Sequence, residues 1–141
     1  MGSAHPKERG QRSEAAILNE LVCRGVTVLR PFGDDERYDL VADVRGELHR
    51  VQVKTGRMEN GRVQFDTRSS TVHTQQGEKR GYEGDIEVFA VYSPDLDDSF
   101  VVPVEEAPKT TMGLRVETAA KESPRTNHAA DYRLERWLEA V

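Results

Sequence analysis

The stretch formed by residues 37–54 constrains the fold more than any other part of the chain. It reads as two short strands joined by a tight turn around Gly46. If the two-residue loop ends at Gly46, Asp39 lies opposite Gln52, and if it begins there, Asp39 lies opposite Lys54. Side chains alternate between the two faces of a strand, so Gln52 and Lys54 share a face, and Asp39 joins them in either register.

A carboxylate, an amide oxygen and an ammonium group on one face of a hairpin have a chemical use. Carboxylate and amide oxygens are hard ligands that suit Mg²⁺ or Mn²⁺. A lysine beside them can orient or deprotonate a water molecule, or neutralise charge on a phosphate in the transition state. The pattern therefore predicts a hydrolytic nuclease site at Asp39, Gln52 and Lys54. On spacing alone, a Lys–Asp pair on an exposed sheet face, worth little to stability, fits equally well.

A helix is predicted ahead of the hairpin, from Ser13, a suitable N-cap, to about Arg24. Glu14 lies on or beside the buried face of this helix, because it precedes members of the apolar stripe by three, four and seven residues. A carboxylate there is a candidate functional group, although a first-turn glutamate favoured by the helix dipole gives the same pattern. Residues 1–10 are predicted to form a flexible arm, and residues 11–141 a single domain.

The remaining sequence predicts further strands and a closing helix. Residues 62–66 are expected to form a third antiparallel strand after an Asn-Gly turn signal, and residues 86–92, the most apolar strand, to be central. Pro103 predicts an edge position for the strand at residues 100–104. The other expected elements are strands at residues 26–29 and 114–117 and a helix at residues 131–141.

Membrane and disulfide-rich classes are disfavoured. No apolar run approaches the length of a membrane span, and the first ten residues lack the apolar segment of a signal peptide. Cys23 is the only cysteine, which excludes an internal disulfide and a cysteine-based metal site, and we expect it in the core. His49 is out of phase with Gln52 and Lys54 and is expected to be structural or at the surface. These features predict a cytoplasmic protein.

The charge is unevenly distributed. The formal net charge is −5, which at first argues against a nucleic-acid partner. Residues 45–80, however, carry eight Lys and Arg against four acids, and the acidic surplus lies in residues 83–122. One basic face and one acidic face are compatible with DNA binding.

The order and spacing of these motifs resemble the PD-(D/E)xK nuclease superfamily, over roughly residues 9–104. The pattern of that superfamily places Glu on the first helix, Asp on the second strand and (Glu/Gln)-x-Lys on the third, and here Glu14, Asp39 and Gln52-Val-Lys54 stand in that order. The chain is most similar to the branch of group I intron-encoded homing endonucleases and less closely similar to archaeal Holliday junction resolvases. Gln52 departs from the commoner acidic residue, and the intron-encoded branch tolerates this glutamine.

The resemblance implies a fold and a mechanism. The fold is an α/β, restriction-endonuclease-like core of αβββ-αβ type, in which helices flank a mixed β-sheet. The activity is Mg²⁺-dependent (or Mn²⁺-dependent) hydrolysis of DNA phosphodiester bonds. Asp39 is then the main metal ligand, Glu14 assists, and Gln52 with the backbone carbonyl of Val53 completes the site. Lys54 positions the attacking water and stabilises developing charge.

The sequence also suggests partners. The long polar stretch at residues 67–84 is the expected DNA-contacting segment, although a disordered surface loop is the alternative, and any sequence specificity is expected from residues 57–82. A duplex offers two strands, which predicts a homodimer, with a tetramer as the fallback, and residues 100–104 and the last helix offer apolar surface for it. Two other functions stay open: a Holliday junction resolvase, and a catalytically weak DNA-binding module, which Gln52 favours. The candidate DNA contacts are Arg57, Arg68, Ser69, Lys79, Arg80 and Tyr82.

Overall fold

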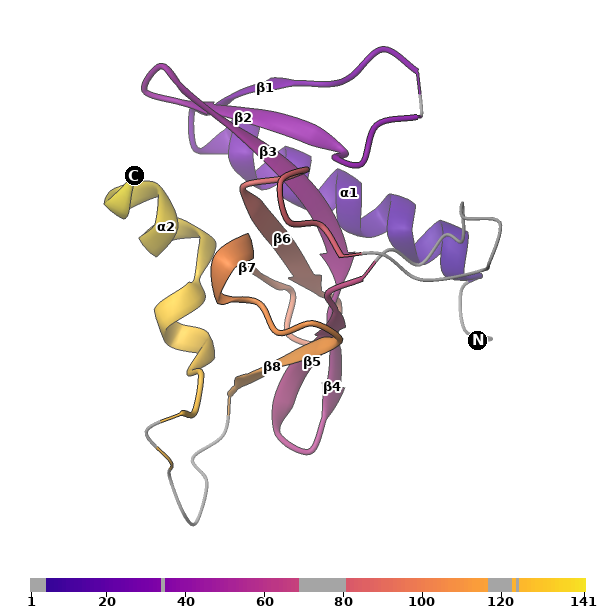
Figure 1. Cartoon of the computed structure of the whole chain (residues 1–141), viewed down its shortest axis with the longest axis vertical. Helices are drawn as coiled ribbons and strands as arrows, with labels where there is room; N and C mark the ends of the chain where they lie inside the picture. The colour runs from indigo at the N-terminus through magenta and orange to yellow at the C-terminus, as the bar shows by residue number, and fades with distance from the viewer. Residues whose placement is uncertain (1–4, 34, 69–80, 117–122, 124) are drawn as a thin grey trace.

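The computed structural model describes residues 5–33, 35–68, 81–116, 123 and 125–141. Within them, a five-stranded mixed sheet has the order β1-β2-β3-β6-β7, and a three-stranded antiparallel sheet has the order β4-β5-β8 (Figure 1). The first sheet comprises β1 (Thr27–Leu29), β2 (Leu40–Val44), β3 (Glu47–Thr55), β6 (Val88–Ser93) and β7 (Asp98–Pro103). The second comprises β4 (Arg57–Glu59), β5 (Arg62–Asp66) and β8 (Thr111–Arg115). The helical elements are α1 (Pro6–Cys23), α2 (Leu134–Ala140) and the short 3-10 turns η1 (Val104–Glu106) and η2 (Ala129–Tyr132).

The predicted hairpin forms between β2 and β3. The two strands pair antiparallel, with Val44 opposite Glu47. The loop is therefore residues 45 and 46, whose φ angles of 52° and 87° are the positive values that a type I′ turn requires. Extended by one residue beyond β2, this register puts Asp39 opposite Gln52, which is the first of the two registers that the sequence allows.

A glycine separates the two sheets. β3 pairs in parallel with β6, and β6 pairs antiparallel with β7. β5, which the sequence places next to the hairpin as its third antiparallel strand, instead lies between β4 and β8 in the second sheet. The chain leaves the first sheet at Gly56, where an added Cβ would clash with Cγ1 of Val63 and lie 3.0 Å from Cγ1 of Val91. Only glycine leaves room for this close approach of the two sheets.

Hydrophobic side chains fill the space on both faces of the five-stranded sheet. On one face, Ile17 and Leu21 of α1 and Leu134 of α2 join a cluster with the inward residues of β2, β3 and β6. On the other face, Phe65 of β5 and Phe89 of β6 belong to a second cluster that the second sheet closes. Both helices thus cover one face, and the three-stranded sheet covers part of the other. This arrangement is α/β with a mixed sheet, as the sequence predicts.

The first helix starts earlier than predicted. It begins at Pro6, with His5 as its N-cap, so residues 6–10 are helical although they were expected within a flexible arm. Residues 1–4 lie outside the described part of the chain. Ser13, expected as the N-cap, lies within the helix and is buried, because its hydroxyl forms a 2.6 Å hydrogen bond with the hydroxyl of Thr55 at the end of β3. Cys23 is exposed rather than in the core, because it lies beyond Leu21, the last buried residue of α1.

The C-terminal helix packs inside the protomer. Trp137 meets His49 edge-on, with 5.1 Å between the ring centroids, which confirms a structural position for His49. Phe100 and Leu134 are also buried, so the apolar surface offered by the sequence for a subunit interface mainly serves the core. β7 is an edge strand that ends at Pro103, as predicted. Among the described helices, none has the length and apolar character needed to cross a membrane.

Candidate active site

Asp39 lies at the entrance to β2 and is held against β3 by two hydrogen bonds. Its N–H donates to the carbonyl oxygen of Val51 at 2.8 Å. Its carboxylate oxygen Oδ2 accepts from the N–H of Val53 at 2.9 Å. Within the described part of the chain, no hydrogen bond reaches the other oxygen, Oδ1. Asp39 therefore has a fixed position and one carboxylate oxygen available to a further partner.

Gln52 and Lys54 follow the alternation of β3. Val51 and Val53 point into the helix-side core, whereas Gln52 and Lys54 are half-buried on the opposite face. The Gln52 side-chain amide lies 3.3 Å from the carbonyl oxygen of Val53, which brings these two candidate ligand groups together. The fixed phase of the strand thus places the amide and the ammonium group on one face, the face to which the register assigns Asp39.

Glu14 approaches this end of the hairpin from α1. The bond between Ser13 and Thr55 fixes the second turn of the helix to the end of β3. The carboxylate of Glu14 accepts a 2.6 Å hydrogen bond from Nη2 of Arg30, which follows β1. Arg30 is a functional neighbour that sequence reasoning missed, because no periodicity connects position 30 with a helix residue.

The electrostatics of Asp39 show how these groups act on one another. The pKa of Asp39 is raised above its ordinary value, chiefly because the carboxyl group is buried, and the Glu14 carboxylate raises it further. The hydrogen bond from Val53 and the positive charges of Lys54 and Arg30 oppose this shift. A nearby cation stabilises the ionised form of a carboxyl group such as Asp39, which burial and a second carboxylate disfavour.

The donor set suits a hard divalent cation. Asp39 offers its unbonded Oδ1, Glu14 offers a second carboxylate, and Gln52 and Val53 offer neutral oxygens. Mg²⁺ and Mn²⁺ prefer oxygen ligands of this kind. Among the described residues, no group of three or more His, Cys, Asp or Glu side chains is arranged to hold a metal ion, and this site contains two such residues, Glu14 and Asp39.

Lys54 is held by two residues from the segment between β5 and β6. Its Nζ donates to the carbonyl oxygen of Arg68 at 2.8 Å and lies 3.4 Å from the hydroxyl of Tyr82. The ammonium group also lies 4.9 Å from the centroid of the Tyr82 ring. Arg37 stacks on the same ring at 4.2 Å and donates from Nη1 to Asp85 at 2.7 Å. The ring of Tyr82, which Arg37 also contacts, thus helps to orient Lys54.

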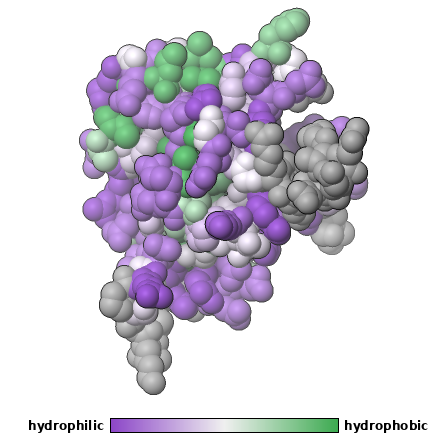
Figure 2. Space-filling view, viewed as in Figure 1, coloured by the Kyte–Doolittle hydropathy of each residue, from purple (hydrophilic) through white to green (hydrophobic). Residues whose placement is uncertain are grey.

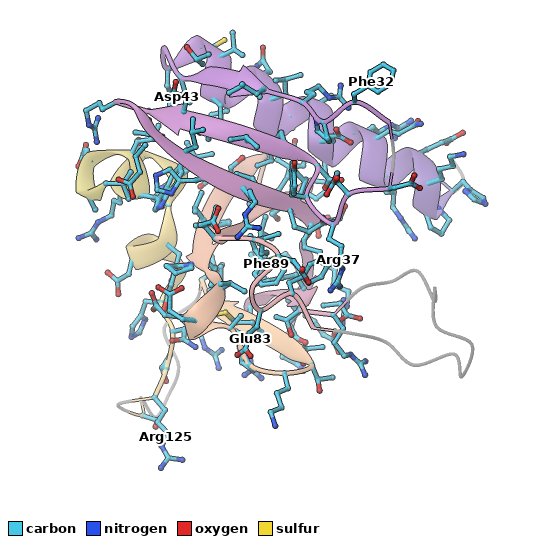
Figure 3. The ribbon with its side chains drawn as sticks, turned by 45° about the horizontal axis from the view of Figure 1, so that its top comes forward. Phe32, Arg37, Asp43, Glu83, Phe89 and Arg125 are labelled. Atoms are coloured by element: carbon cyan, nitrogen blue, oxygen red, sulfur yellow. The ribbon has the colours of Figure 1, made fainter. Side chains whose placement is uncertain are left out.

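Tyr82, one of the predicted DNA contacts, is buried. Only 6% of its surface is exposed, and its ring meets Phe89 edge-on at 5.4 Å. Figure 3 labels Arg37, which precedes β2, and Phe89 of β6. Because Tyr82 is buried between these residues, it supports Lys54 and presents no ring to a nucleobase. Arg37 was also missed as a supporting residue, although it stands two residues before Asp39.

The other predicted DNA contacts have different surroundings. Arg57 is exposed on β4, and its Nε lies 3.3 Å from the carboxylate of Glu59. Arg68 is half-buried, with its side chain 3.6 Å from Asp66 and its carbonyl oxygen on Lys54. The predicted contacts Ser69, Lys79 and Arg80 lie outside the described residues.

Comparisons with known proteins found a matching family and a similar solved structure. A family described as PD-(D/E)XK endonuclease matches residues 4–135. A solved structure described as a bacterial homing endonuclease, I-Ssp6803I, is similar with a TM-score of 0.78 and 27% sequence identity. The match covers 97% of this chain and 93% of that chain. No curated protein matches this sequence significantly.

Proposed function

Because this chain belongs to the PD-(D/E)XK endonuclease family, we propose that it cleaves DNA at the site formed by Glu14, Asp39, Gln52 and Lys54, with Mg²⁺ or Mn²⁺ as the cofactor. The observation that carries this proposal is the position of Asp39. Its carboxylate is locked to β3 through one oxygen, is destabilised by Glu14, and interacts with the charge of Lys54. A cation-binding carboxylate and a nearby positive charge can act together on a scissile phosphate.

The oxygens of Glu14, Asp39 and Gln52 and the carbonyl of Val53 would hold the cation. When bound, the cation polarises the scissile phosphate and makes a water molecule a better nucleophile. The amide of Gln52 is already directed at the Val53 carbonyl. A half-turn of this amide exchanges its nitrogen for its oxygen, which brings a second neutral ligand to the same place. Since Gln52 adds no negative charge, cation affinity depends mainly on Asp39 and Glu14.

Lys54 has the role of positioning the attacking water and stabilising charge on the phosphate. Its ammonium group donates to the carbonyl oxygen of Arg68 and to the hydroxyl of Tyr82, which hold the charge in place. The neighbouring Tyr82 ring and hydroxyl limit the positions that the flexible side chain can occupy. A positive charge held in place before the reaction stabilises the transition state without reorganisation.

The experiment that tests this function is nicking of supercoiled plasmid with and without Mg²⁺. Removal of the Lys54 amine in Lys54→Ala should lower the rate by about 10²–10³-fold, the usual loss for one group that stabilises transition-state charge. Lys7→Ala, which removes an exposed lysine of α1, is the matched control and should nick at the wild-type rate. Equal rates for Lys54→Ala and wild type, or unchanged nicking in EDTA, would show that the site is assigned wrongly.

The substrate class can be refined by the same assay. The similar solved structure is described as a homing endonuclease, which favours a linear duplex target. We therefore expect preferential cleavage of duplex DNA over a synthetic four-way junction. The reverse preference would identify the chain as a junction resolvase with the same chemistry.

We also propose that the protein acts as a homodimer, with a tetramer as the fallback. One site cleaves one strand, and a two-fold axis presents two sites to the two strands of a duplex. Apolar side chains that remain exposed, such as Leu29 and Leu48, supply surface in place of the buried residues of β7 and α2.

A further inference from the structure

The outer face of the three-stranded sheet carries a pocket that the proposed active site does not use. Its volume is about 260 Å³, and it lies over β5 and β8 and the segment that follows β8. The inward residues of these strands, such as Val63 and Leu114, are buried in the core, so the pocket is formed by the alternate, outward residues. Its polar lining consists of Arg62, Thr111, Arg115, Ser123, Arg125, Thr126 and Asn127.

Two of these arginines are forced together by the strand register. Arg62 and Arg115 are direct partners across the antiparallel pair of β5 and β8. Like charges in directly opposed positions of a sheet repel each other. Gly113 gives the Arg62 stem its space, since an added Cβ would lie only 3.1 Å from Cδ of Arg62. The pairing of β5 with β8 therefore holds two positively charged side chains next to each other.

The repulsion is not relieved by neighbouring acids in the described part of the chain. Glu59, the partner of Arg62 in β4, pairs instead with Arg57 at 3.3 Å. No described residue that lines the pocket is acidic. Nη1 of Arg115 donates to the carbonyl oxygen of Asn60 at 3.2 Å, but the Nε groups of Arg62 and Arg115 are buried without a hydrogen-bond partner. Buried donors without acceptors are uncommon in folded proteins and indicate a missing acceptor.

We propose that this pocket binds a backbone phosphate of DNA, outside the cleavage centre. The paired guanidinium groups match the geometry of phosphate oxygens, and the hydroxyl and amide groups of Thr111 and Asn127 add neutral donors. One bound phosphate carries a single negative charge, which reduces the repulsion within the pair, and its oxygens supply acceptors for the two Nε groups. The ligand identity rests on the proposed function, which makes DNA the substrate.

The position of the pocket suits a DNA contact. β4 is separated from the proposed catalytic strand β3 by Gly56 alone, so the second sheet has a fixed position relative to Lys54. Figure 2 shows a mainly hydrophilic surface on the lower part of the molecule, where Figure 1 places β4, β5 and β8. Arg125 lies at this end of the molecule and extends outward (Figure 3). A phosphate held here would fix the register of the duplex against the catalytic strand without reading its sequence.

The test compares the double variant Arg62→Gln/Arg115→Gln with wild type in duplex binding without divalent cations, over a range of salt concentrations. Loss of one phosphate contact should weaken binding similarly for all sequences and make the slope of log affinity against log salt shallower by about one unit. Arg136→Gln, which removes an exposed arginine of α2 that is paired with Asp131 and does not line the pocket, is the control for charge alone. An unchanged slope in the double variant, or an equal change in the control, would overturn the proposal.

A second measurement separates this inference from the nuclease assignment. The Nε–H resonances of Arg62 and Arg115 are followed by NMR while a short duplex, and separately inorganic phosphate, is added to the catalytically inactive Lys54→Ala protein. Shifts with the duplex at concentrations where inorganic phosphate has no effect support a DNA backbone site, even if plasmid nicking fails. Shifts with inorganic phosphate at equal or lower concentration would identify a free-phosphate site, and no shift with either would refute both.

Discussion

Asp39 is the residue whose ionisation links the proposed site to protein stability. Its pKa is raised above the ordinary value of 3.8, so the folded protein holds this proton more tightly than the unfolded chain does. The ionised carboxylate therefore lowers stability, and this loss develops as the pH rises above 3.8 through the raised folded-state pKa. The charge that would bind a cation destabilises the cation-free protein.

Asp39→Asn should remove both the destabilisation caused by the ionised carboxylate and the cleavage activity. Asparagine keeps an oxygen for the Val53 N–H but carries no charge. We expect nicking to fall by about 10²-fold or more, while the Tm in EDTA at neutral pH rises above that of wild type. The difference in Tm should disappear near pH 3, where both side chains are neutral. A lower Tm for the variant at neutral pH, measured by scanning calorimetry, would contradict this account of Asp39.

Tyr82→Phe tests whether the Tyr82 hydroxyl orients Lys54. The variant keeps the ring that packs against Phe89 and Arg37 and removes only the oxygen 3.4 Å from Lys54. Because this bond is long, its loss should cost about 1 kcal/mol, or about fivefold in kcat, with KM and Tm unchanged. Tyr132→Phe, which removes a hydroxyl bonded to Glu106 at 2.8 Å, is the control and should keep the wild-type kcat. An unchanged kcat in Tyr82→Phe would leave the hydroxyl without a positioning role.

The β2–β3 hairpin was predictable from its sequence, because turn chemistry and side-chain alternation act over a few residues. Gly46 located the turn but left two registers open, and the phase of β3 placed His49 on the face opposite to Lys54. The start of α1 was predicted wrongly, because Ser13 satisfies the local rule for an N-cap yet makes its hydrogen bond to Thr55, 42 residues away. A local rule cannot anticipate a tertiary partner for the same hydroxyl.

Gly56→Ala tests the junction between the two sheets. The new Cβ would clash with the Val63 side chain and crowd Val91, both of which are fully buried. Overpacking of this kind should destabilise the protein by about 1–3 kcal/mol in urea unfolding. Gly10→Ala is the control, since nothing lies within 4 Å of its Cβ in α1, and it should stabilise the protein by up to about 1 kcal/mol. A neutral Gly56→Ala would mean that the sheets separate easily at this point.

The arrangement of the whole molecule was less predictable than its elements. The strand at residues 62–66 was found, but its neighbours were not, because alternation identifies a buried face and says nothing about which strand lies alongside. Arg62 and Arg115 meet only through the pairing of β5 with β8, so no sequence pattern could reveal their pocket. The four proposed site residues were named from the sequence because their spacing follows a family pattern.

Assembly is tested by light scattering. If two sites act on one duplex, the mass in solution should be about twice that of the 15.9 kDa chain at micromolar concentration, with or without DNA. A tetramer would show about four times that mass. A monomer under both conditions would refute the proposed dimer.

The division into two sheets also bears on how such an enzyme could change its target. The proposed catalytic groups lie on α1, the hairpin and its flanks, whereas the outward side chains of β4, β5 and β8 contribute nothing to the core beneath them. Substitutions at those outward positions leave the inward residues Val63, Phe65, Met112 and Leu114 in place. Mutation can therefore explore new DNA contacts there at little cost in folding, and the cleavage chemistry can be inherited unchanged while the preferred DNA site drifts.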